Sequence, residues 1–161
     1  MKKLIYNLYI GNQVDYENQI KYENNWAVVH ACKEPYHRKL LSYKKHSVSK
    51  DHPEYLFAER SLRLYLNLVD APSYKYISQE IIDKALDFIK KNINERSVFI
   101  HCNLGMSRSA TIGLLYLASI GYFQGLDFYK AEQKYKKLYP KYNPGRGMRG
   151  FAIENWKKYC K

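Results

Sequence analysis

The sequence predicts an α/β fold in which a central, mostly parallel sheet of four to five strands is flanked by helices. Short runs of β-branched and aromatic residues alternate with longer segments whose apolar residues recur at helical spacing. The short runs are continuously apolar, which is typical of strands that are covered on both faces. The chain has 161 residues, of which 46% are hydrophobic, and this suffices for one domain over residues 1–161 with a sizeable core.

Four segments have the composition of strands. Each is rich in Val, Ile, Leu, Tyr or Phe and ends at polar or turn-forming residues. The first closes at Gly11-Asn12, a pair that favours a turn, and the last ends directly at Cys102. The predicted strands span residues 4–10, 26–31, 63–69 and 97–102.

Four further segments follow the helical period. Ser78 is a good N-cap for the first, which has Gln79 and Glu80 in its first turn and apolar residues at helical spacing through residue 89. The other predicted helices span residues 107–120, 126–138 and 147–159.

Residues 33–58 fit neither period. They contain Pro35 and Pro53 among many basic side chains, and they exceed the usual length of a connection. We interpret them as a loop insertion between the second and third strands. Long loops of this kind are often functional, and an ordinary surface insertion is an equal alternative.

The chain is strongly basic, with a formal net charge of +12. Residues 36–50 hold five Lys or Arg and no acid, and residues 130–149 hold seven Lys or Arg against one Glu. Such a field concentrates anionic ligands, so phosphorylated protein or peptide, nucleic acid and anionic lipid are all open as partners. Each cluster is also compatible with an ordinary solvated face.

The three cysteines are an odd number without a disulfide spacing, which favours a reducing, cytoplasmic location. The first residues lack the continuous apolar core of a signal peptide, and no stretch has the character of a membrane span. His30, Cys32 and His37 match no structural zinc spacing, so we expect no metal and no cofactor.

The most informative segment lies between the predicted strand 97–102 and the predicted helix 107–120, and it reads His-Cys-Asn-Leu-Gly-Met-Ser-Arg-Ser over residues 101–109. A tight strand-to-helix loop can point successive backbone N–H groups at one phosphate, with a Cys102 thiolate below it and the planar Arg108 guanidinium beside it. The same surroundings favour the thiolate form of Cys102. The candidate phosphate-binding residues are Asn103, Leu104, Gly105, Met106, Ser107 and Arg108.

This segment resembles the signature loop Cys-x5-Arg-[Ser/Thr] of the cysteine-dependent phosphatases. Its Gly-x-Ser-Arg-Ser ending is similar to that of the dual-specificity branch of the protein tyrosine phosphatase superfamily. The resemblance implies a protein tyrosine phosphatase-like fold and a Cys102 nucleophile that forms a cysteinyl-phosphate. It further implies that Ser109 hydrogen-bonds the Cys102 sulfur and eases its departure, and that His101 orients the loop from behind.

A phosphomonoester also needs a proton for its leaving oxygen, which calls for an acid on a separate loop. Asp70 follows the third strand, 32 residues before Cys102, and its context resembles the general-acid loop of the family. We expect Asp70 to act as acid in the first step and as base in the second, and an ordinary turn residue is the alternative. Tyr74 and Tyr76 follow this loop and are candidates for the pocket rim.

One position departs from the family pattern. Many members carry a Glu where this chain has Leu104, and that Glu helps orient the arginine. Some other acceptor must therefore hold Arg108. The loop also lacks the lysines of phosphoinositide-cleaving relatives, which weakens the case for a lipid substrate without removing it. Near the C-terminus, Asn143-Pro144-Gly145 resembles the segment before the last helix of dual-specificity phosphatases.

These residues predict a phosphoric monoester hydrolase that dephosphorylates proteins at phosphotyrosine, with phosphoserine and phosphothreonine open as further substrates. Two alternatives stay open. The same site could act on RNA 5′-phosphates or phosphoinositides, which suits the basic clusters. A phosphate-binding pseudophosphatase would keep the pocket without turnover, and it is less favoured because Cys102, Arg108 and Asp70 are all present.

Overall fold

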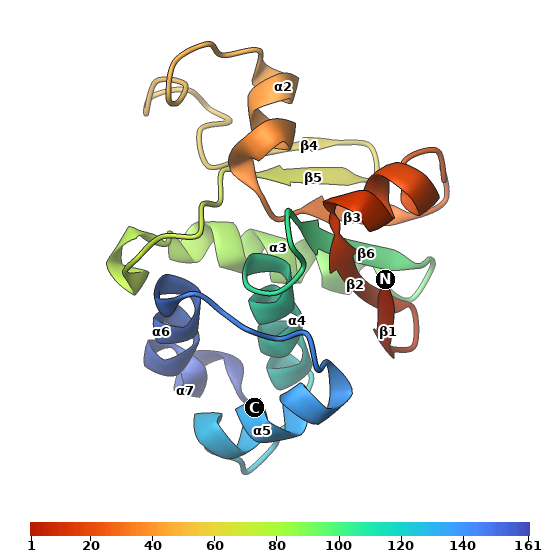
Figure 1. Ribbon diagram of the computed structural model, residues 1–161, viewed down its shortest axis with the longest axis vertical. Coiled ribbons are helices and arrows are strands. Elements are labelled where there is room, and N and C mark those ends of the chain that lie inside the picture. The colour runs from red at the N-terminus through yellow and green to blue at the C-terminus, as the bar shows by residue number, and fades with distance from the viewer.

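Six strands form one mixed sheet in the computed structural model, which describes residues 1–161 (Figure 1): β1 (Lys2–Ile5), β2 (Leu8–Asn12), β3 (Ala27–His30), β4 (Phe57–Arg60), β5 (Arg63–Leu66) and β6 (Val98–Cys102). Their order across the sheet is β1-β2-β6-β3-β5-β4. The four inner strands run parallel, and β1 and β4 pair antiparallel at the two edges. The predicted α/β fold with its mostly parallel sheet is confirmed.

The sheet exceeds the expected four to five strands because both of its edges are hairpins. The segment 4–10, expected as one strand, is divided by a turn in which Asn7 adopts a left-handed φ of 59°, a conformation that asparagine tolerates. At the other edge, β4 begins at Phe57, inside the segment that we interpreted as an insertion. Short edge strands of this kind carry too few residues to show a period of their own.

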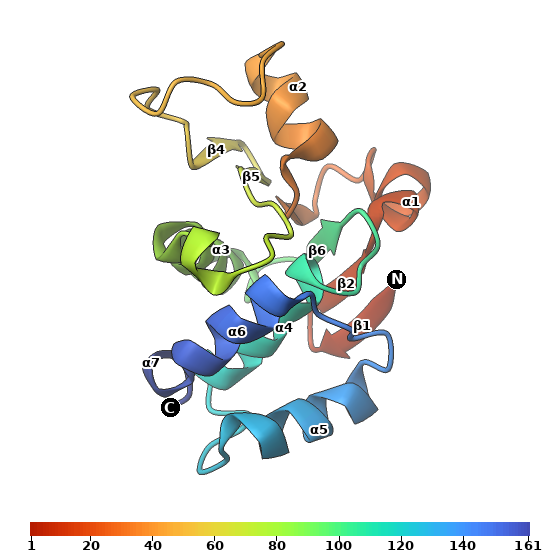
Figure 2. The same cartoon turned by 60° about the vertical axis from the view of Figure 1, so that its left-hand side comes forward.

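Two helices cover one face of the sheet. Helix α3 (Gln79–Asn92) contacts β3 and β5, and helix α4 (Arg108–Ser119) contacts β2 and β6. Residues 109–118 of α4 are all buried, because α4 also lies against the C-terminal helices (Figure 2). These are α5 (Phe128–Leu138), α6 (Arg146–Glu154) and α7 (Trp156–Tyr159).

The expected helix 147–159 is wrong in one respect, since α6 and α7 are separate. They are divided at Asn155, whose ψ of 10° departs from the helical value. Ser78 does stand at the N-cap of α3, but its side chain makes no capping hydrogen bond.

Short helical segments cover the opposite face of the sheet. A short helix α1 (Gln13–Asp15) and a π-helix η1 (Tyr16–Ile20) follow β2, and a π-helix η2 (Lys33–His37) and helix α2 (Arg38–Leu41) follow β3 (Figure 2). Successive residues of β6 alternate between the two faces. His101 therefore contacts the tyrosines of η1 and η2, whereas Cys102 begins the loop toward α4.

Residues 33–58 have more structure than a periodless loop. His37, the last residue of η2, is fully buried and fixes the chain that follows α2. Its Nδ1 lies 3.1 Å from the Tyr43 hydroxyl, and its Nε2 lies 3.0 Å from the Glu54 carbonyl oxygen. Arg38 forms an ion pair with Glu34 at 2.6 Å one helical turn away. The insertion is thus fastened by specific polar contacts rather than by an apolar period.

One cluster of 45 buried hydrophobic residues includes side chains from both faces of the sheet and from the C-terminal helices. The sheet and its two helical layers therefore share a single core. None of the helices combines the length and the apolar character needed to cross a bilayer.

Candidate active site

The Cys102 sulfur lies at the C-terminal end of β6, where the chain turns toward α4. β6 is paired on both sides, by β2 and β3, so the middle of the sheet holds the start of this loop. Cys102 is only 2% exposed. Its Sγ is 3.2 Å from Ser109 Oγ and accepts the Gly105 N–H at 3.3 Å. Both groups can donate to the sulfur, and such donors stabilise a thiolate.

The loop 103–108 curls so that several of its carbonyl groups face outward. Three donors outside the loop bind them: Gln13 N on Asn103 O (3.3 Å), Tyr139 Oη on Gly105 O (2.7 Å) and Asn143 N on Met106 O (3.0 Å). In a trans peptide the N–H points away from the C=O of the same unit. The N–H groups of residues 104, 106 and 107 therefore point to the inner side of the curl, as an anion-binding nest requires.

Gly105 makes this curl possible. Its φ is +73°, in the region that side chains rarely adopt. A Cβ at this position would also lie 2.8 Å from the carbonyl oxygen of Gly11. The loop therefore packs against the end of β2 at a distance that only glycine permits.

The Arg108 guanidinium is held by one acceptor inside the loop and one outside it. Nη2 donates to Asn103 Oδ1 at 2.6 Å, and Nη1 donates to the Leu68 carbonyl at 3.3 Å. Nε is buried and has no partner. Leu104, at the position where the signature pattern often has a Glu, is 72% exposed. Asn103 is thus the acceptor that the sequence left unidentified.

The Asn103 side chain is itself fixed by contacts with two other segments. Its Nδ2 donates to Gln13 Oε1 at 3.2 Å and to the Glu34 carbonyl at 3.0 Å. With its donors occupied on one side, the amide presents its oxygen to Arg108. Asn103 therefore connects loop 103–108 to α1 and to the start of η2.

Asp70 reaches the same loop from the segment that follows β5. Its Oδ1 accepts the Ser107 hydroxyl at 3.0 Å, and Ser107 Oγ accepts the Gly145 N–H at 2.9 Å. The approach is close enough that a Cβ on Gly145 would lie 2.6 Å from Asp70 Oδ1. A Cβ on Gly147 would likewise overlap the Ala71 carbonyl oxygen. Three segments distant in sequence therefore converge around the carboxyl group of Asp70.

A pocket of about 240 Å³ lies above the sulfur, between these three segments. The predicted nucleophile, arginine and acid all line it, and Ser109 and His101 are fully buried. The lining residues are Asp70, Cys102, Leu104, Met106, Ser107, Arg108, Asn143 and Gly145.

His101 lies on the opposite face of β6 and packs within a group of aromatic rings. Its Nε2 is 2.7 Å from His30 Nδ1, and both imidazoles are fully buried. Tyr16 stacks on His101 with ring centroids 4.7 Å apart, and Tyr36 meets it edge-on at 4.9 Å. Burial lowers the pKa of His101 to about 3, so the ring is neutral at physiological pH.

The remaining candidates lie outside the pocket. Tyr74 and Tyr76 do not line it, and Tyr76 lines a neighbouring groove instead. Cys32 is fully buried, and burial raises its pKa to about 12, so it stays a thiol. No three His, Cys, Asp or Glu side chains are grouped as metal ligands.

Sequence reasoning missed two side chains of this site. It assigned only backbone roles to Asn103 and Ser107, whereas their side chains hold Arg108 and Asp70. Asn103 is fixed by Gln13, 90 residues away, and Ser107 lies 37 residues from Asp70. No signal in the sequence pointed to either contact.

Comparison with known proteins finds likeness at the level of structure. No family model matches the sequence, and no curated protein matches it. The crystal structure of DUSP15 matches with a TM-score of 0.64 and 19% identity, over 96% of this chain and 86% of that chain. The Cydia pomonella PTP-2 phosphatase matches with a TM-score of 0.63 and 18% identity, over 96% and 88%.

A structure of PTPMT1 in complex with PI(5)P also matches, with a TM-score of 0.58 and 16% identity, over 98% of this chain and 94% of that chain. At these identities the likeness concerns the fold. The chain has the fold of the dual-specificity and protein tyrosine phosphatases, as the signature loop predicted.

Proposed function

We propose that the chain is a cysteine-dependent phosphatase that hydrolyses phosphomonoesters on proteins. Phosphotyrosine is the principal substrate, with phosphoserine and phosphothreonine as further ones. The observation that carries the proposal is the meeting of Cys102, Arg108 and Asp70 in one pocket, above a loop whose N–H groups face inward. The shared fold with structures described as phosphatases supports it.

In the first step, the Cys102 thiolate attacks phosphorus in line with the leaving oxygen. The S–P bond forms as the P–O bond to the substrate breaks, and the Asp70 carboxyl group donates its proton to the leaving oxygen. Arg108 and the inward N–H groups hold the equatorial oxygens, on which negative charge is spread in the transition state.

In the second step, a water molecule attacks phosphorus of the cysteinyl-phosphate. Asp70, now a carboxylate, takes a proton from this water, and the S–P bond breaks to release inorganic phosphate and the thiolate. Ser109 Oγ, 3.2 Å from the sulfur, donates a hydrogen bond to the departing thiolate. Both steps use side chains of this chain, and the proposal includes no cofactor.

The lining of the pocket favours an aryl phosphate over a polyanionic head group. Leu104 and Met106 contribute apolar surface at the positions flanking Gly105, and an aromatic ring packs well on such surface. PTPMT1, crystallised with PI(5)P, has the same fold, and this chain carries a net charge of +12. Phosphoinositide hydrolysis at the same site is therefore the second candidate.

We further propose that residues 1–161 form one catalytic domain that works in the cytoplasm. Reducing conditions there keep the three cysteines as free thiols. The proposed reaction requires that Cys102 is not oxidised. Residues 33–58 belong to this domain as an insertion fastened through η2 and α2.

Phosphate release from an aryl phosphate and a phosphotyrosine peptide tests the function. The wild-type chain should release phosphate, preceded by a burst of the leaving phenol that reports formation of the cysteinyl-phosphate. Cys102→Ser should lose turnover and still bind the peptide. Cys160→Ser removes a thiol outside the pocket and is the matched control, with an unchanged rate. Full activity in Cys102→Ser contradicts the mechanism, and peptide binding without phosphate release in the wild type indicates a pseudophosphatase.

A further inference from the structure

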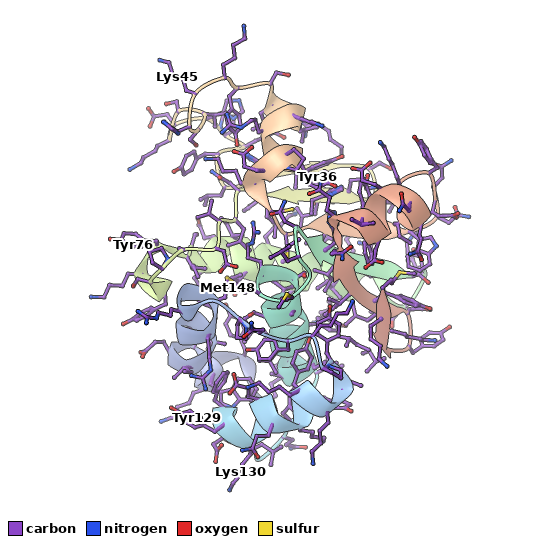
Figure 3. The ribbon with its side chains drawn as sticks, in the orientation of Figure 1. Tyr36, Lys45, Tyr76, Tyr129, Lys130 and Met148 are labelled. Atoms are coloured by element: carbon purple, nitrogen blue, oxygen red, sulfur yellow. The ribbon has the colours of Figure 1, made fainter.

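A groove lies beside the proposed active site, between the insertion 33–58 and the segment that follows β5. Its volume is about 400 Å³. Figure 3 shows Tyr76, on the segment before α3, and Lys45, near the tip of the insertion, on the same side of the molecule. The residues that matter for the argument are Lys33, Ser47, Tyr55, Val69, Lys75 and Tyr76.

The groove adjoins the catalytic pocket across the backbone of residues 68–70. The Leu68 carbonyl accepts the Arg108 guanidinium at 3.3 Å and the Lys33 N–H at 3.0 Å. Val69 lines the groove, whereas the next residue, Asp70, lines the pocket. Neighbouring Cα atoms are about 3.8 Å apart. The groove therefore lies within reach of a residue next to one whose phosphate occupies the pocket.

The groove carries positive charge without a compensating acid. Lys33 and Lys75 line it, none of its lining residues is acidic, and neither lysine forms an ion pair. Lys33 Nζ donates to the His46 carbonyl, which leaves two of its three donors free.

Ser47 contributes a hydroxyl group that makes no hydrogen bond within the chain. Its Oγ is buried and has no partner, although buried polar groups are nearly always paired. Beside these polar groups lie Tyr76 and Val69, which are 74% and 45% exposed. The groove therefore combines two lysines and a buried, unpaired hydroxyl with exposed apolar surface.

We propose that this groove binds an acidic residue next to the phosphorylated residue of a peptide substrate. The inference rests on the proposed function and names its substrate class. A carboxylate would receive hydrogen bonds from Lys33 or Lys75 and from the Ser47 hydroxyl, while Val69 and Tyr76 contact the adjoining part of the peptide. A peptide fits better than an inositol head group because half of the groove's wall is apolar and only two cations line it.

Two phosphotyrosine peptides test the proposal. They differ only at the residues that flank the phosphotyrosine, which are glutamates in the acidic peptide and serines in the serine peptide. The wild-type chain should show a higher kcat/KM for the acidic peptide. Lys75→Glu replaces an attraction with a repulsion, so kcat/KM for the acidic peptide should fall about tenfold, mostly through KM. The serine peptide and p-nitrophenyl phosphate carry no carboxylate that could contact the two lysines. Their kcat/KM should therefore change less than about twofold in Lys75→Glu.

Lys130→Glu is the matched control, because it changes the net charge equally on α5, far from the groove (Figure 3). It should leave the preference between the peptides intact. Ser47→Ala should reduce the preference about threefold, as expected for the loss of one hydrogen bond. Equal losses in Lys75→Glu and Lys130→Glu, or no preference in the wild type, overturn the proposal.

Fluorescence anisotropy of both peptides on Cys102→Ser separates this inference from the proposed function. If the wild-type chain has no turnover but Cys102→Ser binds the acidic peptide more tightly than the serine peptide, and Lys75→Glu abolishes this difference, the groove proposal holds and the proposed phosphatase function is wrong. Equal binding of both peptides refutes the groove whatever the turnover. Binding to vesicles that contain PI(5)P completes the test. If Lys75→Glu weakens binding to these vesicles but not to the acidic peptide, the groove binds a lipid head group and the peptide proposal is wrong.

Discussion

Arg108 Nη2 donates to the Asn103 side-chain oxygen at 2.6 Å, so one residue of the phosphate loop orients another. In the family pattern the orienting acceptor is a glutamate at the position of Leu104. Asn103 supplies a neutral amide in its place, one residue earlier in the chain. A neutral acceptor holds the guanidinium without bringing a negative charge to a pocket that we propose binds a phosphate dianion.

Asn103→Ala should lower kcat/KM for p-nitrophenyl phosphate about tenfold to a hundredfold, because a hydrogen bond to a charged group contributes about 1.5–3 kcal/mol. Asn103→Asp keeps an acceptor but adds negative charge, so it should weaken inhibition by inorganic phosphate or vanadate. Leu104→Ala removes apolar surface from the pocket but no contact of Arg108, so it should raise KM while kcat stays within about twofold. An unchanged kcat/KM in Asn103→Ala would mean that the Leu68 carbonyl alone orients Arg108.

Asp70→Asn tests the acid. It should slow hydrolysis of substrates with poor leaving groups by about 10² to 10³, since their leaving oxygen needs a proton in the transition state. Substrates with very good leaving groups should lose far less in the first step. The measurement is the dependence of single-turnover rate on leaving-group pKa, which should become steeper. Asp87→Asn on the exposed side of α3 is the control, and an unchanged slope in Asp70→Asn excludes Asp70 as the acid.

Much of this site follows from local sequence. The strand, the curl at Gly105 and the buried helix α4 are consecutive, so composition and spacing over residues 97–120 predict them well. The pairing of Cys102 with Ser109 follows from the family resemblance, and the two side chains lie in contact.

The remaining contacts of the site depend on the tertiary fold. Asn103 finds Gln13 because β2 and β6 are neighbours and their ends coincide, with Asn12 opposite Cys102. No periodicity signals such a contact. The split of segment 4–10 and the edge strand β4 were missed for a related reason, since a four-residue strand is defined by its partner more than by its own composition.

Gly145→Ala should reproduce the behaviour of Asp70→Asn without changing an ionisable group. The added Cβ would lie 2.6 Å from Asp70 Oδ1 and must displace the carboxyl group from the Ser107 hydroxyl. We expect a loss of about tenfold or more with poor leaving groups and little change with good ones. Leaving-group dependence, measured as for Asp70→Asn, is the readout.

Gly150→Ala is the matched glycine control, because its Cβ would meet Tyr74 at an ordinary 3.4 Å. It lies within α6 and should raise the free energy of unfolding by up to about 1 kcal/mol, the helix propensity gain of alanine. Its activity should stay unchanged. If Gly145→Ala also keeps wild-type leaving-group dependence, the approach of Gly145 does not position Asp70.

The buried histidines should make the fold sensitive to mild acid. Burial lowers the pKa of His101 to about 3 and lowers those of His30 and His37 as well. Below about pH 6.5 the unfolded chain therefore binds protons that the folded chain refuses, and the free energy of unfolding falls as the pH falls. Each such histidine contributes up to about 1.4 kcal/mol per pH unit between its two pKa values.

Urea unfolding midpoints between pH 7 and pH 5 measure this slope, above the range in which most carboxylates titrate. His37→Gln should reduce the slope, whereas equal stability at pH 7 and pH 5 would show that the folded protein accommodates charged imidazoles at these sites.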